Sequence, residues 1–251
     1  MGKDGHWMKK TDVMGVAFDD MTMDEAADRA LALAKDGAGA YVVTPNPELV
    51  LMAQKDSAYA KTLAGAALTL ADGIGIIYAA KLLKRPLTGR VPGIDFAGAL
   101  MERLAGSGLK LYLLGAKPGV AERAAANLAE RYPGLDICGT RDGYFQEDGP
   151  VIRDIRKKEA DVVFVCLGAP KQERWMERNG AAAGAHLLVG LGGSLDVFAG
   201  TVQRAPGWMQ KAGLEWLYRL AKQPSRIGRM AKLPGFLVKA VFWKDKGGEV
   251  A

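Results

Sequence analysis

The chain has 251 residues, of which 49% are apolar and 25% charged, as is ordinary for a soluble globular protein with a sizeable core. It has only two cysteines, Cys138 and Cys166, which argues against a disulfide framework and favours a reducing compartment inside the cell. Residues 1–10 lack the apolar stretch of a signal peptide, and no run approaches the ~20 apolar residues of a membrane span, so we expect at most peripheral membrane contact.

Strands and helices are predicted to alternate along most of the chain. Residues 12–18 form a predicted first strand, and a capping box of Thr22 and Glu25 predicts a helix over 22–35 that Gly37 closes. Further strands are predicted at 41–43, 68–71, 110–114, 136–138, 162–167 and 186–189. Helices are predicted from Leu49 onward and at 74–83, 94–105, 120–132, 150–158 and 171–179. This alternation predicts an α/β fold, a parallel sheet flanked by helices on both faces.

The chain after residue 205 differs from the rest, with helical pieces predicted at 207–223, 224–232 and 234–243. Between residues 204 and 246 it carries ten lysines and arginines against two acids, a local +8 that leaves −2 for everything else. Three of the five tryptophans, Trp208, Trp216 and Trp243, lie there too. Two interpretations stay open: a helix pair that completes the core, or a basic surface that contacts a membrane. We divide the chain into a core, 1–205, and a helical appendage, 206–251.

Polar side chains follow two of the predicted strands. Thr44 and Asn46 come after the strand at 41–43, Asp72 comes after the strand at 68–71, and Arg90 lies in a later glycine-flanked loop. We expect these groups to meet, because the carboxyl ends of parallel strands share one edge of the sheet. The position of Asp72 before Gly73 favours a helix N-cap, with a general base as the alternative, and Thr44 and Asn46 are equally typical of turns or caps.

Glycine-bearing loops at 115–119, 168–172 and 190–194 could cradle a diphosphate, although each could equally be an ordinary strand-to-helix turn. Neither a phosphate-binding loop ending in Gly-Lys-Ser/Thr nor a clean Gly-x-Gly-x-x-Gly is present, which counts against kinases, ATPases and common dehydrogenases. With only His6 and His186, a metal site finds little support, and His186 is predicted to be a hydrogen-bonded core residue.

Taken in order, five motifs resemble the WecG/TagA/CpsF family of glycosyltransferases over roughly residues 13–229. They are Thr-Pro-Asn-Pro at 44–47, Ala-Asp-Gly at 71–73, Gly-Arg-Val-Pro-Gly at 89–93, Gly-Ala-Pro-Lys-Gln-Glu at 168–173 and Gly-Gly-Ser-Leu-Asp at 192–196. The resemblance implies a Rossmann-like core and inverting transfer of N-acetylmannosamine, or a related hexose, from a UDP-sugar to polyprenyl-diphosphate-linked GlcNAc or a similar lipid-linked sugar. It also implies no metal, no cofactor besides the donor, and work at the cytoplasmic face of the membrane in cell-surface polysaccharide synthesis such as that of teichoic acid.

The same resemblance assigns roles to residues. Asp72 matches the general base, Thr44 and Asn46 match the polar pair beside it, and Arg90 and Gln172 match contacts to donor or acceptor. The remaining expected substrate contacts are Gly115, Gly168, Gly192, Gly193, Asp196, Arg219, Arg226 and Arg229. The last three resemble the arginines of an appendage that closes over the active site and holds the protein on an anionic membrane.

Two rival functions stay open. A non-catalytic UDP-sugar-binding or membrane-scaffold protein would bind the nucleotide sugar or a membrane without releasing UDP. A nucleic-acid binder is suggested only by the charge and aromatic residues of the appendage, and we expect no specific nucleic acid as partner. Apolar surface left uncovered by loss of the appendage would favour self-association, and the sequence leaves a homo-oligomer open.

Overall fold

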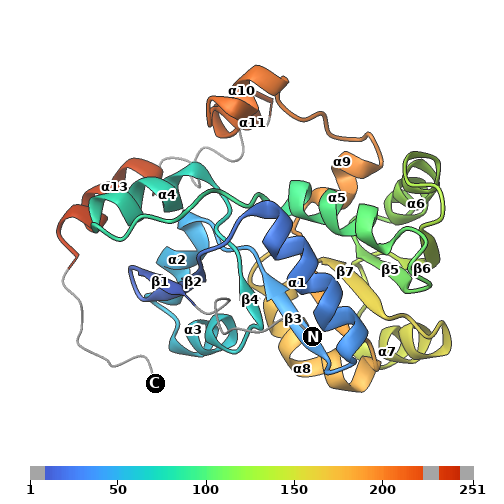
Figure 1. Ribbon diagram of the computed structural model, residues 1–251. Coiled ribbons are helices and arrows are strands. Elements are labelled where there is room, and N and C mark those ends of the chain that lie inside the picture. Colours follow the sequence, from blue (N-terminus) through green and yellow to red (C-terminus); the bar gives the residue numbers. More distant parts are fainter. Residues whose placement is uncertain (1–8, 223–231, 244–251) are drawn as a thin grey trace.

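A six-stranded parallel sheet organises the computed structural model, which describes residues 9–222 and 232–243. Its strand order is β4-β3-β8-β7-β5-β6 (Figure 1). The strands are β3 (Ala40–Val43), β4 (Leu68–Thr69), β5 (Lys110–Gly115), β6 (Asp136–Arg141), β7 (Val162–Cys166) and β8 (Leu187–Gly190). The sheet confirms the predicted α/β class.

Helices cover both faces of this sheet and bury two separate cores. One core contains residues of α1 (Met23–Asp36), α5 (Gly93–Leu104), α6 (Val120–Arg131) and α9 (Ser194–Phe198). The other contains residues of α2 (Pro47–Ala53), α3 (Ser57–Ala64), α4 (Ile74–Leu82), α7 (Asp148–Lys157), α8 (Lys171–Ala183) and α13 (Lys232–Val241). Strand residues alternate between them: in β5, Leu111 and Leu113 join the first core, and Tyr112 and Leu114 the second.

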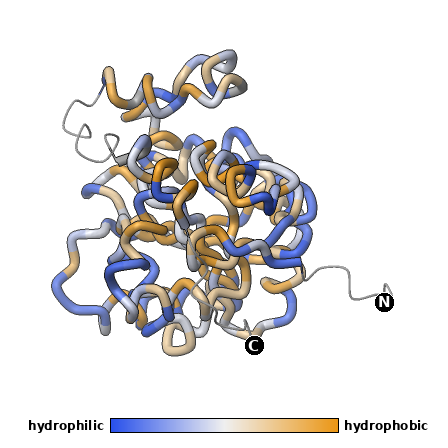
Figure 2. Tube along the Cα trace, turned by 90° about the vertical axis from the view of Figure 1, so that its left-hand side faces the viewer, coloured by the Kyte–Doolittle hydropathy of each residue, from blue (hydrophilic) through white to orange (hydrophobic). Residues whose placement is uncertain are grey.

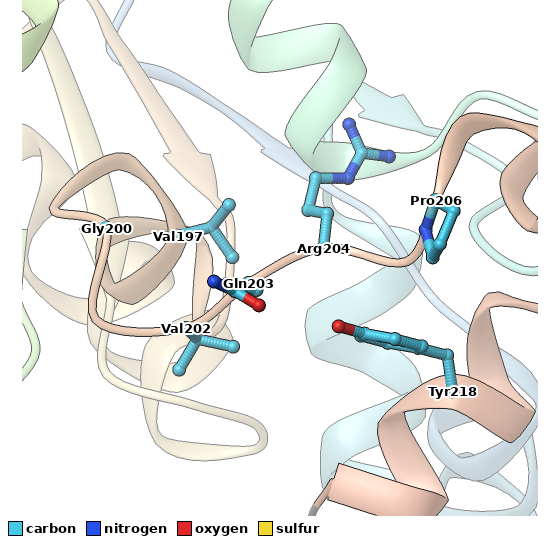
Figure 3. A pocket seen from close by; sticks show the side chains of 7 residues that line it. All are labelled: Val197, Gly200, Val202, Gln203, Arg204, Pro206 and Tyr218. Atoms are coloured by element: carbon cyan, nitrogen blue, oxygen red, sulfur yellow. The ribbon is translucent and has the colours of Figure 1, made fainter.

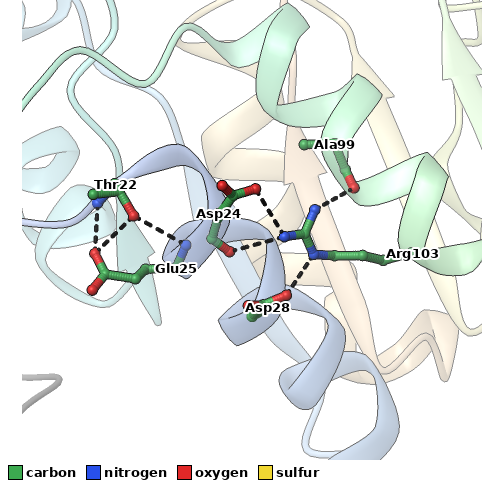
Figure 4. A network of polar contacts seen from close by, with 6 residues as sticks. All are labelled: Thr22, Asp24, Glu25, Asp28, Ala99 and Arg103. Atoms are coloured by element: carbon green, nitrogen blue, oxygen red, sulfur yellow. Dashed lines mark hydrogen bonds and ion pairs between the residues drawn. The ribbon is translucent and has the colours of Figure 1, made fainter.

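Helix α1 is fixed at its ends and along its side. The predicted capping box is present, with Thr22 at the N-cap and Glu25 bonding back to it, and Gly37 closes the helix in a left-handed conformation. Arg103 of α5 donates hydrogen bonds to Asp28 at 2.5 Å and to Asp24 at 3.1 Å (Figure 4). This clamp holds α5, and therefore the loop that precedes it, against α1.

The start of the chain departs from prediction. In place of one strand over 12–18 there is an antiparallel hairpin of β1 (Lys10–Val13) and β2 (Val16–Asp19), outside the main sheet. Its two turn residues, Met14 and Gly15, both have positive φ, 56° and 89°. Such turns usually carry Asn-Gly or Asp-Gly, so Met14 hides the hairpin signal. Met14 is fully buried, and this burial offsets its unfavourable backbone conformation.

Several helix boundaries also differ from prediction. Helices α3 and α9 were not predicted, and α8 runs on to Ala183 through Gly180, where the missing Cβ lets Leu188 pack closely. The predicted helix at 207–223 is broken at Gly213, whose φ is 72°, into α10 (Gly207–Lys211) and α11 (Glu215–Lys222). The piece predicted at 224–232 lies outside the described residues except at its last residue, Lys232, where α13 begins.

The C-terminal region contains two kinds of helix. Helix α13 packs on α4 and α2, and its Phe236 and Ala240 are buried in the core, so the core-completing interpretation holds for α13. Helices α10 and α11 instead stand apart from the sheet (Figure 1), and apolar and polar stretches alternate along them at the top of Figure 2. The predicted division at residue 205 stays a prediction, since α13 lies against the core.

Candidate active site

The predicted residues converge where β3 and β8 end side by side. The chain leaves β3 toward α2 on one face of the sheet and leaves β8 toward α9 on the other. Such a switch point leaves a crevice at the carboxyl ends of the strands, where ligands bind in open α/β sheets. Thr44 spans it, because its Oγ1 donates a hydrogen bond to the carbonyl oxygen of Gly190 at 3.1 Å.

The loop at 89–93 closes on Thr44 from the side of α5. A Cβ atom added to Gly93 would lie 3.1 Å from Oγ1 of Thr44, so a larger residue here would fit only if Thr44 shifted by a few tenths of an ångström. The backbone N–H of Val91 donates to the carbonyl oxygen of Ala71 at 2.9 Å, which ties the same loop to the residue before Asp72. The motifs at 44–47, 71–73 and 89–93 therefore share one place in space.

Asn46 has a structural role beside its predicted chemical one. It is the N-cap of α2, and its Oδ1 accepts hydrogen bonds from the backbone N–H groups of Glu48 at 2.9 Å and Leu49 at 3.2 Å. Its Cβ would lie 3.8 Å from a Cβ added to Gly73. The cap therefore holds Asn46 beside the residue that follows Asp72.

Asp72 is half-buried at this edge of the sheet. Its backbone N–H donates to the carbonyl oxygen of Pro45 at 3.2 Å, which brings it to the loop that follows β3. The N-cap residue of α4 is Gly73, with φ 89°, and not Asp72. The prediction that Asp72 is the N-cap residue is therefore wrong, while its role as general base stays a prediction.

Arg90 joins the active-site edge to the appendage. It is half-buried, and its Nη2 donates to the backbone oxygen of Gln210 in α10 at 3.4 Å. The turn between α10 and α11 packs against the start of α4, since a Cβ added to Gly213 would lie 3.1 Å from the Cγ1 of Ile74. The appendage thus rests on the first residue of α4, two positions after Asp72.

The arginines expected to act from the appendage are only partly placed. Arg219 belongs to α11, and its side-chain position is not described. Arg226 and Arg229 lie outside the described residues. Their predicted contacts to the substrate stay predictions.

Arg204 is a connection that sequence reasoning missed. Its guanidinium binds both oxygens of Asp95 in α5, at 2.6 and 3.1 Å, and lies 3.5 Å from Glu215 at the start of α11. Two-pronged arginine–carboxylate pairs combine strength with fixed geometry. The three residues therefore form a latch between core and appendage. Position 204 carried no local signal for it, because Asp95 is 109 residues away.

We predict that Arg204→Gln loosens α10 and α11. Losing a charge-assisted hydrogen bond costs ~2 kcal/mol. If this loss lowers the free energy of local opening of α10 and α11, amide hydrogen exchange in these helices becomes roughly 30-fold faster. Exchange followed by mass spectrometry measures this. Arg103→Gln is the matched control, since Arg103 is also 21% exposed and also binds two carboxylates, but between α1 and α5. Equal exchange in the appendage of both variants would contradict the latch.

The glycine loops after β7 and β8 present backbone to open space. Gly168 and Gly192 have φ of 74° and 55°, and nothing lies within 4 Å of a Cβ added to either. Gly193 is exposed in the same turn, and the backbone oxygen of Asp196 in α9 accepts bonds that shape the following linker. A diphosphate cradle at these loops stays a prediction with room to form.

Gly115 and His186 were also singled out from the sequence, the first as a substrate contact and the second as a hydrogen-bonded core residue. A Cβ on Gly115 would lie 2.3 Å from the carbonyl oxygen of Cys166, so this glycine lets β5 and β7 pack closely. Nδ1 of His186 lies 2.8 Å from the carbonyl oxygen of Ala34, so the predicted hydrogen-bond contact is present, but the side chain is 36% exposed and the prediction of a core residue is wrong. Among residues 9–222 and 232–243, no three histidine, cysteine or acidic side chains gather as a metal-binding group.

Two cavities lie beside the linker to the appendage. One of about 540 Å³ opens between the linker and α11, where the Tyr218 hydroxyl points toward Gln203 and Arg204 (Figure 3). Another of about 410 Å³ lies among α5, α6 and α9. Neither is lined by Thr44, Asn46 or Asp72. In the part of the chain that is described, none of the helices combines the length and the apolar character needed to cross a membrane.

Comparisons with known proteins agree with this geometry. The model of the glycosyl transferase WecG/TagA/CpsF family matches residues 11–249. An N-acetylglucosaminyldiphosphoundecaprenol N-acetyl-beta-D-mannosaminyltransferase of Staphylococcus aureus strain MW2 is 35% identical over 240 residues, covering 94% of both chains. The proteins of the same name from strains NCTC 8325 and MRSA252 match to the same extent. The chain therefore belongs to the WecG/TagA/CpsF family and is a glycosyltransferase.

Proposed function

We propose that the chain transfers N-acetylmannosamine, or a closely related hexose, from a UDP-sugar to GlcNAc linked through diphosphate to a polyprenyl lipid. The acceptor follows from the names of its relatives, which act on N-acetylglucosaminyldiphosphoundecaprenol. The observation that carries the proposal is the meeting of Thr44, Asn46 and Asp72 at the ends of β3 and β4. A hydroxyl, an amide and a carboxylate together suit the recognition and deprotonation of a sugar hydroxyl.

The proposed reaction is a single displacement that inverts the anomeric carbon. The acceptor hydroxyl oxygen forms a bond to that carbon while the bond from the carbon to the UDP oxygen breaks. Asp72 takes the hydroxyl proton, and UDP leaves with the electron pair of the broken bond. A base acts in this way when it lies within ~3 Å of the hydroxyl.

The departing diphosphate needs positive charge and N–H donors. Arg90 reaches from the loop at 89–93 to the appendage, and a Cβ on Gly168 or Gly192 in the turns after β7 and β8 would meet only open space, although the N–H of Gly192 itself is bound to Gln172. We assign leaving-group stabilisation to these groups together with Arg219, Arg226 and Arg229, without a metal.

We also place the protein at the inner face of the cell membrane. Large apolar side chains stand exposed on α4, α10, α11 and α13 and just past the end of α13. They are Tyr78, Leu82, Trp208, Leu217, Val238, Val241 and Phe242. The segment from residue 204 to 246 carries ten lysines and arginines against two acids, and each lysine or arginine near an anionic surface contributes about 1 kcal/mol before salt screening. Exposed apolar side chains on a basic segment suit a peripheral membrane contact.

We predict that UDP is released only when donor and lipid acceptor are both present, and at the same rate in EDTA. The test is a panel of UDP-sugars with a short-chain diphosphate-linked GlcNAc, with UDP release and product formation measured together. UDP-N-acetylmannosamine is expected to give the fastest transfer. Binding of a UDP-sugar without UDP release from any donor would support the rival non-catalytic function. Loss of transfer in EDTA, restored by a divalent cation, would contradict the metal-free mechanism.

A further inference from the structure

A fully buried carboxyl group lies beside the predicted site without an assigned role. Glu173, in the first turn of α8, is 0% exposed, which is rare for a glutamate. Its Oε1 accepts a hydrogen bond from Nε2 of the neighbouring Gln172 at 2.8 Å. Burying a carboxyl group costs free energy unless the group is hydrogen-bonded and either paired or neutral.

Gln172 connects this carboxyl group to the switch point. Its Oε1 accepts a hydrogen bond from the backbone N–H of Gly192 at 2.9 Å. Its Nε2 would lie 3.0 Å from a Cβ added to Gly190, whose carbonyl oxygen accepts the Thr44 hydrogen bond. A continuous path of contacts therefore runs from Glu173 through Gln172 and the end of β8 to Thr44.

The orientation of the Gln172 amide decides whether this path holds. An amide side chain has one accepting end and one donating end. Only the accepting oxygen can bind the N–H of Gly192, so the nitrogen must point the other way. Oε1 of Glu173 receives that nitrogen and thereby selects the orientation.

We propose that Glu173 is a positioning residue for sugar transfer: it orients the Gln172 amide, which holds the Gly190–Gly192 turn against Thr44. The effect on transfer rests on the proposed function, whereas the hold on the turn does not. Both polar atoms of Gln172 have partners in the protein, so a positioning role stands beside its predicted contact to the substrate.

The surroundings of Glu173 suit a neutral carboxyl group. Burial raises the pKa of Glu173 above its ordinary value. The pKa of the Tyr59 hydroxyl is also raised, mainly by burial and secondly by the neighbouring Glu173. Within the described part of the chain, neither Oε2 of Glu173 nor that hydroxyl has a hydrogen-bond partner of normal geometry. Asp56 at the N-cap of α3 and Arg174 on α8, whose charges act on Tyr59, are bonded to each other. A protonated Glu173 keeps Oε1 as an acceptor, so glutamine should replace it well.

The raised pKa gives a direction for stability against pH. Between the ordinary glutamate pKa and the raised pKa in the fold, the folded state binds more protons than the unfolded state. Stability must therefore fall as the pH rises through that window. Glu173→Gln removes this titration, so its melting temperature is expected to rise relative to that of the original protein across the same window.

The decisive comparison uses three substitutions on α8. Glu173→Gln keeps an accepting oxygen, Glu173→Met fills the same space without one, and Glu177→Ala is the control. Glu177 is one turn further along and bonds Thr62, away from Gln172. Amide hydrogen exchange at Gly192 reports on the turn, and kcat and KM for transfer report on catalysis.

In Glu173→Met, we expect the amide hydrogen of Gly192 to exchange roughly tenfold faster, as fits the loss of one hydrogen bond. The kcat of this variant should fall by a similar factor, with KM less affected, because the loss lies in alignment. Glu173→Gln and Glu177→Ala should match the original protein in both. Unchanged exchange at Gly192 in Glu173→Met, or equal losses in Glu173→Gln, would overturn the positioning role. If the original protein transfers no sugar, the proposed function fails, while the exchange at Gly192 still decides whether Glu173 holds the turn.

Discussion

Asp72→Asn is expected to lower sugar transfer by about 10²–10⁴-fold while leaving the fold intact, as typically follows loss of a general base. Asparagine has nearly the same shape as aspartate but cannot take up a proton at neutral pH. The fold should survive because the contact of residue 72 to Pro45 uses its backbone N–H, and because asparagine keeps the size and one acceptor oxygen of the aspartate side chain. The kcat at saturating donor and acceptor measures the loss, and the melting temperature checks the fold.

A matched control separates loss of a base from loss of negative charge at this edge of the sheet. Glu48, in the first turn of α2, is also half-buried and lies two residues after Asn46. We expect Glu48→Gln to retain transfer. Full activity in both Asp72→Asn and Asp72→Ala would exclude Asp72 as the base. Equal losses in Glu48→Gln and Asp72→Asn would point to the summed charge of this edge instead.

The parallel sheet could be predicted because its strands carry a strong local signal. Every residue from Val162 to Cys166 is buried, and such continuous apolar runs between helices are typical of parallel strands covered on both faces. The hairpin at the start could not be predicted in the same way. Its turn depends on Met14 adopting a positive φ, which burial in the folded protein makes tolerable.

The site was predictable where its contacts are local and hidden where they are not. Thr44, Asn46 and Asp72 each follow a strand, so their place at one edge follows from the parallel arrangement. The pairing of β3 with β8 depends on the order of strands, and the hydrogen bond from Thr44 to Gly190 joins residues 146 apart in the chain. The latch at Arg204 and the path through Gln172 depend on such distant contacts, which motif spacing does not encode.

The appendage shows a further limit of sequence patterns. Composition treats Trp208 and Trp243 alike, as aromatic residues in a basic segment. In the fold, Trp208 is 66% exposed, while Trp243 is only half-buried and lies against Gly15 in the β1–β2 turn. Periodicity reveals that a helix has an apolar face, but tertiary packing decides whether that face meets the core or the solvent.

Removing everything after residue 205 would therefore mix two effects. It would take away α10 and α11, which reach the active-site edge, and also α13, which covers α4 and α2. Loss of activity or of membrane binding could then come simply from exposed core. Point substitutions on α13 separate the two roles, because this helix carries a buried phenylalanine and is followed directly by an exposed one.

Phe236→Ala is expected to lower the free energy of unfolding by about 3–5 kcal/mol, the usual cost of removing a buried phenylalanine from a core. Phe236 is 0% exposed, whereas Phe242, just past the end of the same helix, is 78% exposed. Phe242→Ala should therefore change stability by no more than about 0.5 kcal/mol. Urea unfolding followed by circular dichroism measures both variants.

Binding to anionic vesicles should show the opposite order. Losing one inserted phenylalanine removes roughly 1.5–3 kcal/mol of apolar burial, so Phe242→Ala should bind vesicles at least tenfold more weakly. Phe236→Ala, studied where it stays folded, should bind them as the original protein does. Unchanged vesicle binding by Phe242→Ala would place the membrane contact away from α13. Unchanged stability of Phe236→Ala would show that α13 is not part of the core. The assignment of Phe236 to the core and of Phe242 to the membrane contact would then fail.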